Sequence, residues 1–213
     1  MRTIFLDIET LHCDPADFTP TPDEAPSNYK DPEKIAAYIA AKEAEQLART
    51  SLDSHQGRLL CIGAAVDDEP PACVYDRPPG DMLDWLAERV DCNLDRDGDL
   101  LLVGHNITGF DLPWLWRLAV RERHPVASML PWARYGGRHV ADTMQLWSLP
   151  SPERISLDTI CRFLGIPGKG DFGGKDVAAA YARGEHERIQ TYCMADVERV
   201  RAVYRRLPAS VKP

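Results

Sequence analysis

The chain has 213 residues, of which 44% are hydrophobic, and a formal net charge of −8. This size suits one globular domain with a core, and the negative charge argues against a protein that coats nucleic acid through a basic surface. Neither an apolar run of about 18 residues nor the apolar segment of a signal peptide occurs, so we expect a cytoplasmic protein that does not enter the membrane.

The N-terminal quarter of the sequence predicts a strand followed by an insert. Residues 2–8 form an apolar strand, and residues 13–32 contain five prolines, which indicates a loop. A helix should follow, with Asp31 as its N-cap and Pro32 in its first position. We therefore expect a loop-plus-helix insert at about 13–55, long enough to fold over a neighbouring cleft as a lid or strand guide.

The remaining sequence alternates between strand and helix patterns. The continuous apolar run at 99–106 is typical of a buried parallel strand. Further strands are predicted at 58–66, 71–76 and 138–143. Helices are predicted at 81–90, 111–122, 153–164 and 185–206. This succession predicts an α/β fold with a mixed sheet.

Acidic residues follow two of these strands and lie on the last helix. Asp7 and Glu9 are two residues apart at the end of the first strand, so they point to one face. Asp111 comes just beyond the strand at 99–106, and the carboxyl ends of parallel strands lie at one edge of a sheet. Tyr192 and Asp196 are four residues apart and share a helical face. Four carboxylates in one cleft would raise each other's pKa values, and oxygen ligands suit Mg²⁺ or Mn²⁺.

Three motifs carry a resemblance to a known family. The segments "FLDIET", "GHNITGFDLPWLWRLA" and "YCMADVERV" resemble the exonuclease motifs of the DEDD (DnaQ-like) proofreading-exonuclease superfamily. Tyr192 matches the tyrosine branch, DEDDy, whereas Thr191 stands where the other branch has a histidine. The second motif most resembles the exonuclease domain of family-B DNA polymerases, including stand-alone bacterial and phage exonucleases. The resemblance spans about residues 2–206.

The resemblance implies a fold, a reaction and a cofactor. It implies a ribonuclease H-like, mixed five-stranded sheet flanked by helices, in a single exonuclease domain over residues 1–213. It implies 3′–5′ hydrolysis of DNA, at single-stranded or frayed 3′ ends, to nucleoside monophosphates. Two Mg²⁺ or Mn²⁺ ions would be held by carboxylates, and a tyrosine would orient the attacking water. The matching catalytic residues are Asp7, Glu9, Asp111, Tyr192 and Asp196, and the four acids among them are the metal ligands.

Alternatives and partners stay open at this point. The chain could be an RNA exonuclease of ribonuclease D type, or a non-catalytic nucleic-acid-binding module on the same fold. The motifs suit proofreading or DNA repair, and any polymerase or replication protein is expected to be a separate partner, because no polymerase sequence follows the last predicted helix.

Six residues are candidates for substrate binding, each with an ordinary structural alternative. Two follow the first motif and either contact the terminal nucleotide or pack at the strand exit. Two belong to the second motif and either tie the loop and stack on a base, or pack in the core. Two lie in a glycine-rich segment and either meet phosphates or stay solvated. These pairs are Thr10 and Leu11, Asn106 and Phe110, and Lys169 and Lys175.

Two further groups have mainly structural interpretations. Asp142 lies at the end of the short strand at 138–143 and is interpreted as a helix cap or a support for the four acids. The arginines of the last helix are interpreted as a solvated face: Arg199, Arg201, Arg205 and Arg206. The six cysteines form no C-x-x-C pair, so free thiols are expected.

Overall fold

The computed structural model describes residues 2–93, 100–131, 139–148 and 153–213. The chain divides into two compact units, one made of Met1–Glu9 and Leu59–Pro213, and the other of Thr10–Arg58. Within the described ranges, every helix is too short or too polar to cross a membrane.

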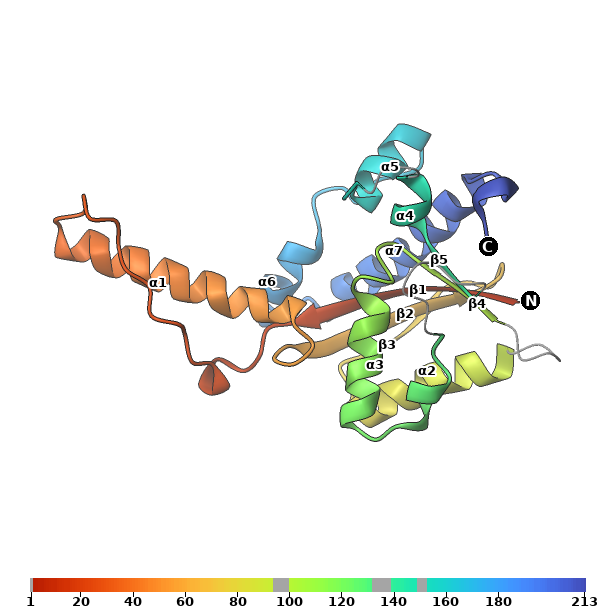
Figure 1. Cartoon of the computed structure of the whole chain (residues 1–213), viewed down its shortest axis with the longest axis horizontal. Helices are drawn as coiled ribbons and strands as arrows, with labels where there is room; N and C mark the ends of the chain where they lie inside the picture. The colour runs from red at the N-terminus through yellow and green to blue at the C-terminus, as the bar shows by residue number, and fades with distance from the viewer. Residues whose placement is uncertain (1, 94–99, 132–138, 149–152) are drawn as a thin grey trace. The chain divides into compact units, whose positions relative to one another are not determined.

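A five-stranded sheet forms the centre of the first unit, with the order β3-β2-β1-β4-β5 (Figure 1). Strand β4 runs parallel to both β1 and β5, whereas β3 is antiparallel to β2. The strands are β1 (Arg2–Leu11), β2 (Arg58–Val66), β3 (Ala72–Tyr75), β4 (Leu100–Gly104) and β5 (Val140–Asp142). The mixed five-stranded α/β sheet predicted from the sequence is therefore confirmed.

The two-residue period of the central strands divides the core into two layers. Ile4 and Leu6 of β1 belong to one buried cluster, whereas Phe5 belongs to the other. Helices on the two sheet faces complete these clusters. The first cluster includes residues of α2 (Pro79–Asn93) and α3 (Asp111–Arg121), and the second includes residues of α5 (Leu157–Leu164) and α7 (His186–Arg206). Odd-numbered residues of β1 in the first unit thus share the face that carries α7.

Local capping explains where the predicted helices differ from the observed ones. Helix α5 begins at Leu157 rather than at residue 153, because the Ser156 side chain accepts a hydrogen bond from the Thr159 backbone N–H. It ends at Leu164, and the next residue, Gly165, caps it with a φ of 68°. Two short helices were not predicted, because each offers less than two turns of pattern: α4 (Thr143–Trp147) and α6 (Val177–Ala182).

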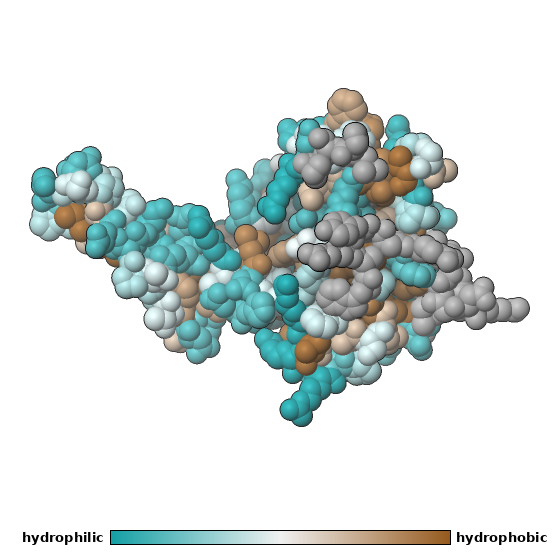
Figure 2. Space-filling model, in the orientation of Figure 1, coloured by the Kyte–Doolittle hydropathy of each residue, from teal (hydrophilic) through white to brown (hydrophobic). Residues whose placement is uncertain are grey.

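The second unit holds the loop and helix that the sequence predicted between the first two strands. Helix α1 spans Pro32–Arg49, and the Asp31 side chain caps it by accepting from the Glu33 backbone N–H. The chain before the helix is tied to it by two hydrogen bonds between Thr21 and Gln46. No residue of α1 is buried, and its surface in Figure 2 is mostly hydrophilic.

Close packing between β2 and α7 depends on a glycine. A Cβ atom at Gly63 would lie 2.8 Å from the Cys193 Sγ and 3.1 Å from the Val197 Cγ2. Both neighbours are fully buried. The missing side chain therefore allows α7 to approach the sheet.

We predict that Gly63→Ala lowers the free energy of unfolding by about 1–3 kcal/mol, because the added methyl overpacks this contact. Gly80→Ala is the matched control, since nothing lies within 4 Å of a Cβ atom there and alanine favours the helix. Urea denaturation of both variants tests this prediction, and equal stability of the two would contradict it.

Candidate active site

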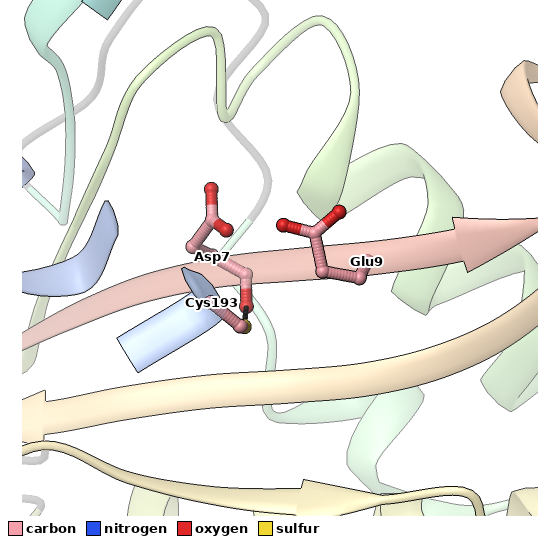
Figure 3. Close-up of side chains that lie close together, drawn as sticks. All are labelled: Asp7, Glu9 and Cys193. Atoms are coloured by element: carbon pink, nitrogen blue, oxygen red, sulfur yellow. Dashed lines mark hydrogen bonds between the residues drawn. The ribbon is translucent and has the colours of Figure 1, made fainter. Parts of the chain in front are cut away.

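Asp7 and Glu9 occupy the face of β1 that carries α7. Their carboxylates extend from the same side of the strand (Figure 3). The Glu9 residue is 7% exposed, and its carboxylate has no hydrogen bond or ion pair among the described residues. The two-residue spacing therefore places two negative charges together, as predicted from the strand pattern.

Asp111 reaches the same place from the neighbouring strand. It is the first residue of α3, which follows β4, and it is 4% exposed. Its Oδ1 accepts a hydrogen bond of 3.1 Å from the Ile8 backbone N–H. Because β4 is the parallel neighbour of β1, the residues after its carboxyl end lie beside the first two acids.

Asp196 and Tyr192 come from α7, and both are buried. The Lys169 ammonium pairs with the Asp196 Oδ2 and also donates to the Tyr192 hydroxyl at 2.8 Å. The Arg199 guanidinium donates to the Asp196 Oδ1 at 2.7 Å. Both oxygens of Asp196 therefore have cationic partners, unlike the carboxylate of Glu9.

Burial and the charges of neighbouring acids both raise the pKa values of these residues, and burial is the larger cause. Desolvation and then the charge of Glu9 raise the pKa of Asp7 well above its usual range. Desolvation, followed by the charge of Asp196, raises the pKa of Glu9 to about 8. Burial raises the pKa of Asp111 to about 7, although backbone N–H donors oppose this. The charge of Asp196 contributes to all three increases, so the four acids form one electrostatic cluster.

Tyr192 is a protonated phenol in this setting. Desolvation and then the charge of Asp196 raise the pKa of its hydroxyl above the usual value for tyrosine. At neutral pH the group can donate a hydrogen bond, but it cannot serve as a base.

Cys193 is a neighbour of the acids that the sequence interpretation missed. Its sulfur and carboxylate oxygens of Asp7 and Glu9 lie within 4.8 Å of one another. The thiol donates to the Asp7 backbone carbonyl at 3.7 Å (Figure 3). A hydrogen bond with Cys61 lowers its pKa and burial raises it, to a final value of about 12. The spacing of three residues from Asp196 is the sequence signal that could have identified it.

The loop between β4 and α3 is fixed by Asp142. This buried carboxylate caps α4 and accepts from the Asn106 backbone N–H at 2.9 Å and from the Thr108 hydroxyl at 2.6 Å. Asn106 has a φ of 59°, a conformation that asparagine tolerates better than most residues. Phe110 packs against the first core cluster. The interpretation of Asp142 as a helix cap is confirmed, and Asn106 and Phe110 both have structural roles.

The remaining candidates for substrate binding lie in different surroundings. Lys175 belongs to a short, exposed 3-10 helix, Gly174–Asp176. Thr10 and Leu11 are the last residues of β1 and belong to the second unit, where the Thr10 hydroxyl donates to the Ser51 carbonyl at 2.7 Å. Lys169 is thus the member of this group that contacts Asp196.

The interpretation of the α7 arginines as a solvated face is wrong for two of them. Arg199 binds Asp196 and the carbonyls of Pro167 and Gly168. Arg201 is 7% exposed and donates to the carbonyls of Asp67 and Glu69. Backbone carbonyls of loops replace water around both guanidinium groups, and helical spacing alone cannot reveal this.

Comparison with known proteins identifies the family. Residues 97–210 match a family described as a predicted 3′–5′ exonuclease related to the exonuclease domain of PolB. The chain belongs to this family. It is therefore a predicted 3′–5′ exonuclease, whose substrate is a nucleic acid, and such families depend on metal ions in general. No curated relative matches the chain in sequence.

A solved structure shows the same fold. The family B DNA polymerase from the hyperthermophilic archaeon Pyrobaculum calidifontis matches with a TM-score of 0.60 and 14% identity. The match covers 97% of this chain and 24% of the polymerase. The exonuclease thus spans about a quarter of the length of the polymerase to which it is similar.

The donor set of this exonuclease fits a hard divalent cation. The buried acids supply only oxygen donors, the type that Mg²⁺ and Mn²⁺ prefer. Desolvation, followed by the charges of neighbouring acids, raises the pKa values of Asp7, Glu9 and Asp111, and a bound divalent cation would favour their charged forms. The Cys193 thiol is neutral and donates to the Asp7 carbonyl, and we do not assign it as a metal ligand.

We predict that, in EDTA, the free energy of unfolding falls as the pH rises from 5 to 8. The raised pKa values of Glu9 and Asp111 mean that the folded protein binds more protons than the unfolded chain in this window, so raising the pH favours unfolding.

Asp111→Asn removes one titrating group and keeps an acceptor for the Ile8 N–H. Between pH 5 and 8, the free energy of unfolding of this variant should therefore fall less than that of the unaltered protein, by on the order of 1–2 kcal/mol. Urea denaturation at several pH values measures the difference between the two proteins. Parallel curves for both would show that the cluster does not titrate in this way.

Proposed function

We propose that the protein is a metal-dependent exonuclease that removes nucleotides from single-stranded or frayed 3′ ends of DNA. The observation that carries the proposal is that Asp7, Glu9, Asp111 and Asp196 come from β1, α3 and α7 and lie close enough for their charges to interact. The family match supports the 3′–5′ direction. We further propose that residues 1–213 act as one exonuclease domain, with 13–55 as an insert.

In this proposal the carboxylates form the ligand sets of two metal ions. Asp7, Glu9 and Asp196 would hold one divalent ion, and Asp7 and Asp111 would hold the other. When bound, the ions supply positive charge to the attacking and leaving oxygens of the displacement. The Asp111 Oδ1 accepts a hydrogen bond from the Ile8 N–H, which would orient this carboxylate before it holds an ion.

The reaction is hydrolysis of the terminal phosphodiester. A water oxygen bonds to phosphorus, the bond from phosphorus to the 3′ oxygen breaks, and that oxygen gains a proton. The products are a nucleoside 5′-monophosphate and a strand one nucleotide shorter. Tyr192 would orient the attacking water by a hydrogen bond from its protonated hydroxyl. Lys169, which already contacts this hydroxyl and Asp196, would place a positive charge near the phosphate.

We expect EDTA to abolish digestion of a 3′-labelled single strand, and Mg²⁺ or Mn²⁺ to restore it. Asp7→Ala and Asp196→Ala should each lower the rate by several orders of magnitude, because each removes a metal ligand. Rates are measured with matched single-stranded DNA, duplex DNA and RNA, labelled at either end. A loss below about tenfold, or ~1.4 kcal/mol, would contradict the ligand assignment, and preferred digestion of RNA would replace the DNA proposal.

Tyr192→Phe should lower the rate less than either aspartate variant and leave the affinity for Mn²⁺ unchanged, because the phenol orients water and holds no ion. Calorimetric titration with Mn²⁺ gives the affinity independently of activity. Equal weakening of Mn²⁺ binding by Tyr192→Phe and Asp196→Ala would exclude a role limited to orientation.

A further inference from the structure

A pocket of about 420 Å³ lies beside Tyr192, within the range of small-ligand sites, roughly 300–1,000 Å³. The segment before α6 contributes Lys169 and Phe172, and α7 contributes the rest of the wall. The residues of α7 that matter here are Arg188, Thr191, Tyr192 and Arg199. Two of the residues that bind Asp196, Lys169 and Arg199, thus also line this pocket.

The pocket wall is cationic although the chain is acidic. Three basic residues and a single acid, Glu187, line it, whereas the whole chain has a formal net charge of −8. The Lys169 side chain is 23% exposed and that of Arg188 is 46% exposed. Acids already pair with all three basic residues, Lys169 and Arg199 with Asp196 and Arg188 with Glu185 and Asp171. The exposed parts of Lys169 and Arg188 can still donate hydrogen bonds to an anionic group.

Arg188 also offers a flat surface. Its guanidinium carbon lies 4.6 Å from the centre of the Phe172 ring, which in turn meets the Tyr192 ring edge-on at 5.0 Å. The guanidinium also forms ion pairs with Glu185 at 3.0 Å and Asp171 at 3.7 Å. Phe172 is 8% exposed, so Arg188 is the planar group that remains accessible. Nucleobases stack on such arginine planes as they do on aromatic rings.

We propose that this pocket is a nucleotide subsite, in which the base stacks on Arg188 and the phosphate lies toward Lys169 and Thr191. The inference rests on the proposed function, since it places the subsite beside the carboxylate cluster. A nucleotide there is either one unit of the bound strand or the released monophosphate. Both have the same recognition chemistry, a phosphate joined to a flat base.

The first test uses deoxyadenosine 5′-monophosphate and the full chain in EDTA, so that no turnover occurs. Arg188→Ala should weaken binding about tenfold, in line with the loss of one stacking contact. Arg188→Lys keeps the charge but loses the plane, and it should weaken binding similarly. Arg183→Ala is the matched control, because Arg183 also pairs with Glu185 but does not line the pocket. Calorimetry gives the affinities, and deoxyribose 5-phosphate, which lacks a base, should not distinguish Arg188→Lys from the unaltered protein.

The second test replaces the mononucleotide with a fluorescent single strand. A tenfold loss with the strand alone identifies a strand unit, and a loss with the mononucleotide alone identifies the product; either supports the subsite. Equal affinities of Arg188→Ala and Arg183→Ala for both ligands, or no binding of either ligand to the unaltered protein, would overturn it.

The two proposals fail separately. Digestion of DNA without any effect of Arg188 on binding rejects the subsite alone. Nucleotide binding that depends on Arg188, without digestion of any strand, supports the subsite and rejects the proposed function.

Discussion

Repulsion between carboxylates that water cannot fully solvate is the constraint on which this molecule depends. Ion pairs with Lys169 and Arg199 balance the negative charge of Asp196, but Glu9 has no comparable cationic partner in the described part of the chain. Buried carboxylates without partners are costly, and a fold built only for stability would not collect them. Burial of the two apolar layers between the sheet and its helices offsets this unfavourable free energy and holds the acids in place.

Close packing, and not charge alone, holds α7 against the sheet despite the repulsion between the acids. Gly63 leaves room for the helix, and the Cys193 thiol joins it to the β1 backbone. These contacts hold α7, which carries Asp196, close to the sheet and to the strand that carries Asp7 and Glu9. Asp142 positions another of the acids, because its hydrogen bonds fix the loop between β4 and α3 that leads into Asp111.

Much of the fold was predictable because its signals are local. The apolar runs of β2 and β4 and the Asp31-Pro32 start of α1 are visible in the sequence, and the strand period places Asp7 and Glu9 on one face. Lys169 shows what was harder to predict: its glycine-rich surroundings have no periodicity, so its ion pair with Asp196 depends on tertiary structure alone. Arg201 and Cys193 lie on α7, where helical spacing predicts their face but not their partners, which are backbone carbonyls distant in sequence.

The hydrogen bond between Cys193 and Asp7 joins residues 186 positions apart. Closing a loop of this length costs conformational entropy before the contact stabilises the fold, and contacts of long sequence separation are associated with slow folding. During synthesis, Asp7 and Glu9 are therefore made long before α7, the helix that supplies the Tyr192 phenol and the Asp196 carboxylate.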